Sequence, residues 1–172
     1  METAATEEEE NDEDSSKDQG KDDVSLMSLV EGFQKNQSLR IVRIGNCPLS
    51  QDATSDLVYG LTFLPNLEEL FASNTKCGSK AVRVIADILE NEQCKLRVLN
   101  LSGLRSGAID ILPLATSLTK NKSLAELKIG NNTIADHGLD SLAQALEHNV
   151  SLRKLHIKRI NYDEGFRALF SK

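Results

Sequence analysis

The sequence predicts an α/β fold in which strand–helix units stack into a solenoid, and two regularities carry this prediction. Five short segments recur with their first residues 28, 29, 28 and 28 positions apart, and each is apolar at its first, fourth and sixth places. After each of the first four segments, apolar residues return at helical spacing. One such unit cannot bury its own apolar face, so neighbouring units must stack. The five segments begin at Leu39, Leu67, Leu96, Leu124 and Leu152.

The helical stripes define the second half of each unit. Comparable apolar stripes occupy residues 57–61, 82–89 and 114–118. Pro113 falls in the third of these helical segments, and a helix that begins near Ile111 leaves it in the first turn, where proline is tolerated. In the fourth unit the stripe consists of Leu139, Leu142, Ala143 and Leu146.

The turn that follows the fourth strand carries a recognisable pattern. Asn132 stands three residues after the last apolar strand position, Ile134 follows two residues later, and Gly138 precedes the helix. Residues 124–151 therefore resemble the ribonuclease-inhibitor-like subtype of leucine-rich repeats, which reads L-x-x-L-x-L-x-x-N/C-x-L before a helix. The resemblance implies a short curved horseshoe with parallel strands on its concave face and helices on its convex face.

The other units match the turn pattern to different degrees. The first unit has Cys47 and Leu49 at the corresponding places. We expect Cys47 to be a buried thiol in the turn, and Cys77 and Cys94 to be packed as well, because free cysteines are mostly buried. The remaining units depart from the pattern with the pairs Thr75 and Cys77, Leu104 and Ser106, and Ile160 and Tyr162.

The two ends of the array need separate treatment because a solenoid exposes its core there. Residues 24–38 are apolar at helical spacing and end like the other units, so we expect an N-terminal capping helix there and a repeat domain over 24–172. At the other end, Phe166, Leu169 and Phe170 are expected in a helix that covers the last repeat. An imperfect cap would favour pairing between ends, so we expect a monomer or a weak end-to-end dimer.

Residues 1–23 differ sharply in composition from the rest of the chain. They hold eleven carboxylates against two lysines, a local charge of −9, and almost no large apolar side chain. Such a segment buries too little surface to offset its ordering entropy, so we expect a disordered acidic tail. A solubilising role is one interpretation. The other is that the tail folds back on a basic part of the domain and competes with a partner.

The sequence carries no pattern typical of catalysis. It lacks a G-x-S-x-G nucleophile motif, a G-x-x-x-x-G-K-[ST] phosphate loop and any C-x-x-C pair. We therefore expect neither an enzyme nor a cofactor or metal site. Three cysteines and no apolar run of 18 residues favour a cytoplasmic protein without a membrane partner, with nuclear and cytoskeletal or ciliary association left open.

The strand surfaces supply the candidate binding residues. The second, third and fifth places of each segment are predicted to face solvent. Aromatic and arginine side chains dominate interface hot spots, so Phe71, which we expect to be exposed, ranks first with Arg43, Arg97 and His156. The full set of candidates for binding a partner protein is Arg40, Arg43, Glu69, Phe71, Arg97, Asn100, Lys128, Arg153, Lys154, His156, Lys158 and Arg159.

The charge of this surface bears on the partner. It has mixed signs at its centre and becomes basic toward the last unit, which favours an acidic protein partner. Two tyrosines and no tryptophan offer no stacking platform, so nucleic acid is not expected. The sequence thus predicts a non-enzymatic scaffold or adaptor that binds protein on its concave strand face. The alternatives are a small-GTPase regulator resembling Ran GTPase-activating proteins, a tropomodulin-like actin-filament cap, and a fragment resembling innate-immune sensors.

Overall fold

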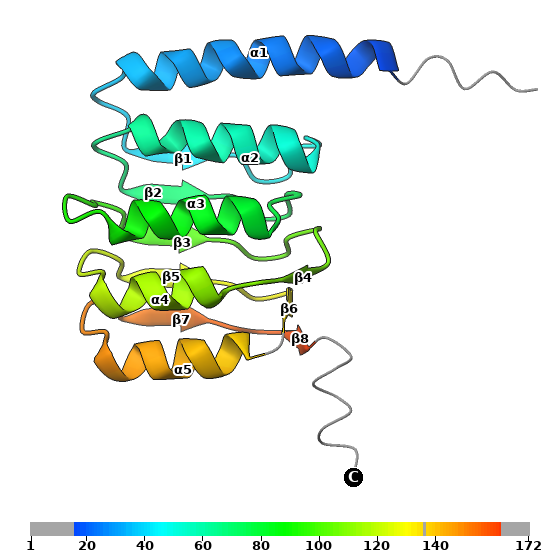
Figure 1. The fold of residues 1–172 in the computed structure, drawn as a ribbon. Coiled ribbons are helices and arrows are strands. Elements are labelled where there is room, and N and C mark those ends of the chain that lie inside the picture. Colours follow the sequence, from blue (N-terminus) through cyan, green and yellow to red (C-terminus); the bar gives the residue numbers. More distant parts are fainter. Residues whose placement is uncertain (1–15, 136, 163–172) are drawn as a thin grey trace, which may run out of the picture.

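Helices form one layer of the molecule and a parallel sheet forms the other (Figure 1). The structure is a computed structural model that describes residues 16–135 and 137–162, with side chains described between residues 26 and 161. Within this part the helices lie side by side, each next to the helix of the following unit (Figure 1). They are α1 (Ser16–Lys35), α2 (Gln51–Gly60), α3 (Ser79–Glu90), α4 (Leu112–Lys120), α5 (Gly138–His148) and the short 3₁₀-helix η1 (Leu61–Phe63).

The main sheet contains one three-residue strand from each unit. All of its pairings are parallel, and neighbouring strands align with equivalent residues opposite each other, as Val42 opposite Leu70 shows. The sheet order, β1-β2-β3-β5-β7, follows the chain once the short strands of the turns are set aside. The five strands are β1 (Ile41–Arg43), β2 (Glu69–Phe71), β3 (Val98–Asn100), β5 (Glu126–Lys128) and β7 (Lys154–His156).

A second, smaller parallel sheet joins the turns of the last three units, and the sequence did not predict it. Its order is β4-β6-β8. Each of its strands has only two residues, too short for an alternating pattern to be visible in the sequence. These strands are β4 (Ala108–Ile109), β6 (Thr133–Ile134) and β8 (Asn161–Tyr162).

The core lies between the two layers and confirms the α/β solenoid. Leu70, Leu99 and Leu127 occupy the fourth place of their segments and are 0% exposed. Each of them packs between the equivalent residues of neighbouring units, which is how stacking creates a continuous core. The last unit differs, since Ile157 at its sixth place is 48% exposed. No further main-sheet strand stacks beyond β7 within the described residues, so this side chain lacks a covering unit.

Each unit leaves its strand through a residue with left-handed backbone. The residue seven positions after the start of each segment has φ between 55° and 68°. Asparagine and glycine adopt this conformation at little cost, whereas other residues suffer a clash between Cβ and the following carbonyl. Four units follow this preference and the last has an arginine. The five residues are Asn46, Asn74, Gly103, Asn131 and Arg159.

Asparagine side chains also connect one unit to the next where the helices end. The Asn121 Oδ1 atom accepts hydrogen bonds from the backbone N–H groups of Ser123 (3.0 Å) and Leu124 (2.7 Å). Its Nδ2 atom donates to the Leu89 carbonyl of the preceding helix at 2.8 Å. Asn149 repeats the arrangement one unit later and donates to the Leu118 carbonyl at 2.7 Å. These amides satisfy helix-end carbonyls that would otherwise lack a partner.

The N-terminal helix begins earlier than its composition indicated. We expected a helix over 24–38, but α1 starts at Ser16 and ends at Lys35. Residues 16–23, assigned to the acidic tail on composition, are therefore helical. A helix that is already formed at one end extends easily, because each added residue contributes an internal hydrogen bond. The rest of the tail and the expected C-terminal cap with Phe166, Leu169 and Phe170 lie outside the described residues.

Two smaller expectations about burial were wrong. Cys47 is exposed in the turn after β1, which is an edge strand of the main sheet, whereas Cys77 is buried as expected. In α5 the residue that packs inward is Ala145, at 2% exposure, and Ala143 faces solvent. Ala145 lies three residues after the buried Leu142, on the same helix face. Pro113 lies in the first turn of α4, as expected.

Replacing Asn121 by alanine should lower the free energy of unfolding by about 2–3 kcal/mol, because it leaves buried backbone groups of two units without partners. Asn91→Ala is the matched control: Asn91 ends α3 at the equivalent place, is exposed, and accepts one hydrogen bond, from the Gln93 N–H. That control should cost less than about 1 kcal/mol. Urea unfolding followed by circular dichroism measures both, and equal losses would show that the buried amide is not a link between units.

Replacing Arg159 by asparagine should stabilise the last unit by about 0.5–1 kcal/mol, because asparagine tolerates the left-handed backbone that arginine resists. The neighbouring Lys158→Asn removes the same charge outside this backbone position and serves as the control. Amide hydrogen exchange in β7 and β8 is the measurement. Slower exchange in the Arg159 variant alone is expected, and equal exchange in both would rule out backbone strain as the cause.

Candidate protein-binding face

The solvent-facing side chains of the main sheet form aligned rows, and we call this side of the sheet the strand face. The parallel register places equivalent residues of adjacent strands opposite each other. Equivalent side chains therefore lie one strand spacing apart, about 4.8 Å. One row consists of Ile41, Glu69, Val98, Glu126 and Lys154, and the next of Arg43, Phe71, Asn100, Lys128 and His156.

We call the part of the strand face at β1 and β2 its first half, and the part at β3, β5 and β7 its second half. Charges on the first half are paired between its two neighbouring strands. Arg40 lies 3.3 Å from Glu68, and Arg43 lies 3.9 Å from Glu69. The Arg43 guanidinium also lies 4.7 Å from the centre of the Phe71 ring, in a cation–π contact. Phe71 is consequently half-buried, and the expectation that it is exposed was wrong. Positive and negative charges balance in this half of the face.

A single carboxylate stands among three basic side chains in the second half. Glu126 accepts a hydrogen bond from Lys128 at 2.9 Å, and His156 and Lys154 lie 3.3 Å and 3.6 Å from its oxygens. The Lys128 hydrogen bond and the nearby basic groups hold the pKa of Glu126 below its usual value, against the opposing effect of desolvation. The Glu126 side chain is only 18% exposed, which makes it the fixed centre of this cluster.

Basic side chains without a counter-charge surround this cluster. Arg97, Arg153, Lys158 and Arg159 are exposed and form no ion pair within the described residues. The second half of the strand face therefore carries a local excess of positive charge. A shallow hollow of about 360 Å³ opens beside the cluster, lined by Glu68, Glu69, Arg97, Val98, Ala125, Glu126, Arg153 and Lys154.

The structure brings ten of the twelve sequence candidates onto the strand face. The other two, Lys158 and Arg159, lie past the end of β7 in the bend of the last unit. The candidate set omitted Glu68 and Glu126, whose carboxylates pair with Arg40 and with the basic cluster. Both occupy solvent-facing places of their segments, so aligning the five units by register would have shown them opposite basic residues.

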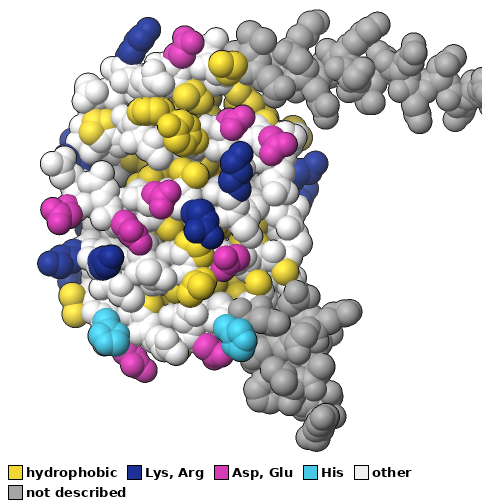
Figure 2. All heavy atoms as spheres, in the orientation of Figure 1, with side chains coloured by type: hydrophobic (Ala, Val, Ile, Leu, Met, Phe, Trp, Pro, Cys, Tyr) yellow, Lys and Arg dark blue, Asp and Glu magenta, His cyan; other side chains and the backbone are white. Residues whose placement is uncertain are grey.

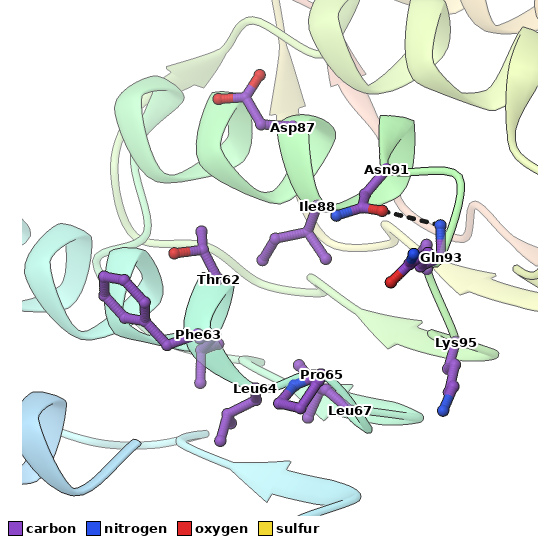
Figure 3. A pocket seen from close by; sticks show the side chains of 12 residues that line it. Thr62, Phe63, Leu64, Pro65, Leu67, Asp87, Ile88, Asn91, Gln93 and Lys95 are labelled. Atoms are coloured by element: carbon purple, nitrogen blue, oxygen red, sulfur yellow. Dashed lines mark hydrogen bonds between the residues drawn. The ribbon is translucent and has the colours of Figure 1, made fainter. Parts of the chain in front are cut away.

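Another hollow lies at the loop edge of the solenoid, away from the strand face (Figure 3). It has a volume of about 310 Å³ between η1 and the end of α3, and Leu64, Pro65 and Ile88 are among the residues that line it. Lys95 at its rim donates a hydrogen bond to the Asn66 side chain at 2.6 Å. The loop before Leu96 carries the extra residue of the 29-residue spacing. Gln93, Cys94 and Lys95 of this longer loop line the hollow.

Comparison with known proteins gives the same architecture. No protein-family model matches the chain. The ribonuclease inhibitor of Sus scrofa is 30% identical over 125 residues, which is 72% of this chain and 27% of that protein. NACHT, LRR and PYD domains-containing protein 12 of Homo sapiens is 32% identical over 134 residues, 76% of this chain and 12% of that protein. The chain is a leucine-rich-repeat protein of the ribonuclease-inhibitor-like type.

A solved structure agrees with this leucine-rich-repeat architecture. The C-terminal domain of tropomodulin from Caenorhabditis elegans matches with a TM-score of 0.64 at 21% sequence identity, over 77% of this chain and 82% of that domain. At this identity the match concerns the fold alone. The chain spans about a quarter or less of the length of the curated relatives described above, so their activities and partners are not established for it.

Two further observations concern the part of the leucine-rich-repeat chain that the structure describes. There, no group of three or more histidine, cysteine or acidic side chains could hold a metal ion. No helix in this part combines the length and the apolar character needed to cross a membrane.

The Glu126 cluster makes stability depend on pH in a predictable direction. Because folding lowers the pKa of this carboxyl, its contribution is present above the ordinary glutamate value, about 4.3, and is lost as pH falls through the folded value. Glu126→Gln should thus destabilise the domain near neutral pH, and this destabilisation should shrink as pH falls below about 4.3. Urea unfolding at a series of pH values measures this. Lys128→Gln should weaken the same dependence, and an unchanged profile would contradict the assignment to this pair.

Proposed function

We propose that this leucine-rich-repeat domain is a non-enzymatic interaction module whose strand face binds an acidic segment of a partner protein. The observation that carries the proposal is the charge excess in the second half of the face. Arg97 and Arg153 have no ion-pair partner in the described part of the chain, and Glu126 is shared by Lys128, Lys154 and His156. Incoming carboxylates would supply the missing counter-charges.

The geometry supports an extended acidic segment as the bound form. The Arg97 and Arg153 side chains line the same hollow, which is open to solvent and also lined by Lys154. Its carboxylates, Glu68, Glu69 and Glu126, are already paired with basic side chains of the face. Arginine binds carboxylates through two parallel hydrogen bonds, so it combines charge with orientation. Rim charges of this kind act mainly on the rate of association and on selectivity. The first half of the face, where Arg40 and Arg43 are already paired, would contribute less to acidic recognition.

Other roles remain predictions from resemblance. Regulation of a small GTPase, capping of actin filaments and a role resembling innate-immune sensors each rest on repeat similarity, and no contact in the described residues favours one of them. A scaffold or adaptor role in the cytoplasm fits the proposal, and it too stays a prediction.

A fluorescent peptide of about 12 residues that alternates glutamate and serine tests the proposal by titration of the full chain. Arg97→Gln combined with Arg153→Gln should weaken binding about tenfold, and the wild-type affinity should fall between about 50 and 200 mM NaCl. Lys80→Gln combined with Arg83→Gln removes the same net charge from exposed positions of α3 and is the matched control.

Glu126→Gln adds a test with the opposite sign. Removing this carboxylate frees three basic groups, so the affinity for the glutamate peptide should rise about threefold. If the α3 control loses as much affinity as the strand-face variant, net charge and not the face explains binding. Absence of binding at about 1 mM peptide would also overturn the proposal.

A further inference from the structure

A second surface with the opposite charge lies on the helical side of the molecule, between α1 and α2. A hollow of about 790 Å³ opens there, and its walls come from both helices and from Ser50, just before α2. In Figure 2 hydrophobic side chains gather over the region where Figure 1 places these helices, with acidic and basic side chains around them. The lining residues are Leu26, Met27, Val30, Glu31, Gln34, Ser50, Asp52, Ala53, Asp56 and Tyr59.

Large apolar side chains in the walls of this α1–α2 hollow are exposed to solvent. Among its lining residues, Met27 is 68% exposed and Tyr59 is 55% exposed. Within the described residues, two of the seven exposed large hydrophobic side chains therefore line this hollow, together with Leu26 and Val30. Clustered apolar side chains bordered by polar ones are typical of interaction sites, whereas single ones are ordinary.

Close packing at the base holds the two helices in place. Gly60 ends α2, and a Cβ atom there would lie 2.9 Å from the Val30 Cγ2 atom and 3.1 Å from the Phe33 Cδ2 atom. A larger residue at this position would force the Val30 or Phe33 side chain to shift. On the other side, the Tyr59 ring packs edge-on against Phe63, with ring centres 5.6 Å apart. The hollow thus exists before any partner arrives, which lowers the entropic cost of binding.

The charged residues that line the α1–α2 hollow are all acidic. Glu31, Asp52 and Asp56 line it, no lysine or arginine does, and none of the three carboxylates forms an ion pair in the described part of the chain. The Ser50 side chain already caps α2 by accepting a hydrogen bond from the Ala53 N–H at 3.1 Å. The N-terminus of this helix is therefore satisfied, and the acidic rim is left to face solvent.

We infer that the α1–α2 hollow binds an amphipathic helix of a partner protein, with leucine-like residues on one face and lysine or arginine beside them. Two helices lying side by side form a groove that a third helix fills with its apolar face. The acidic rim selects basic flanks by charge complementarity. It also disfavours the chain's own residues 1–15, which carry eight carboxylates and no basic residue. The protein would then hold an acidic partner on one side and a basic partner on the other.

A pair of synthetic peptides tests this inference on the full chain. Both are helices of about 18 residues with leucines on one face, and the remaining positions are lysine in one peptide and glutamate in the other. The lysine peptide should bind at least about tenfold more tightly than the glutamate peptide. Equal binding of the two, or no binding of the lysine peptide at about 1 mM, would overturn the inference.

Substitutions locate the binding site. Met27→Ser combined with Tyr59→Ser should weaken the lysine peptide about tenfold, because both apolar walls are lost. Leu112→Ser is the control, since Leu112 is 52% exposed on α4, away from this hollow. Its effect should stay below about twofold. An equal loss in the control would refute the location, and the thermal unfolding midpoint shows whether each variant is folded.

The acidic rim has a separate signature. Glu31→Gln combined with Asp56→Asn should weaken the lysine peptide about threefold and reduce the dependence of its affinity on salt. An unchanged affinity and salt dependence would overturn the role of the rim. None of these variants touches the strand face, so they should bind the glutamate–serine peptide as the wild type does. Failure of one proposal therefore leaves the other intact.

Discussion

The structure depends on one constraint, which is that every unit buries its leucines only against its neighbours. Leu70, Leu99 and Leu127 are 0% exposed because each lies between equivalent residues of adjacent strands. A shift of one residue in any strand would turn its apolar side chains toward solvent. The repeat length can therefore vary only in the loops, and the extra residue of the second spacing, from Leu67 to Leu96, lies in the loop before Leu96, next to the hollow shown in Figure 3.

The same register that buries the leucines arranges the exposed charges. Glu126 lies opposite Lys154 in one row, while Lys128 and His156 stand in the next, so one carboxylate meets three basic groups from two strands. Pairs in the first half of the face satisfy each other in the same manner. The net positive charge of the second half is thus a consequence of which residues the repeat places opposite one another.

In the two proposed binding modes, the opposite charges on the two sides of the domain would separate the two partners. An acidic segment would be repelled from the α1–α2 hollow by Glu31, Asp52 and Asp56, and a basic helix would be repelled from the second half of the strand face. Each surface would thus exclude the partner of the other, which is how like-charge repulsion produces specificity. In a rigid solenoid, two partners bound in this way would be held at a fixed separation.

The sequence by itself determined the repeat, the strand–helix order and the side of each strand that faces solvent, because these follow from periodicity along the chain. Only the tertiary structure decided which side chains meet between units. Arg43 covers Phe71, and Glu126 meets its basic neighbours, because long side chains contact each other across strands. Cys47 and Ile157 are exposed because they lie in the first and last units of the stack. The α1–α2 hollow likewise arises from two helices whose apolar residues look ordinary in the sequence, because packing between units leaves part of them uncovered.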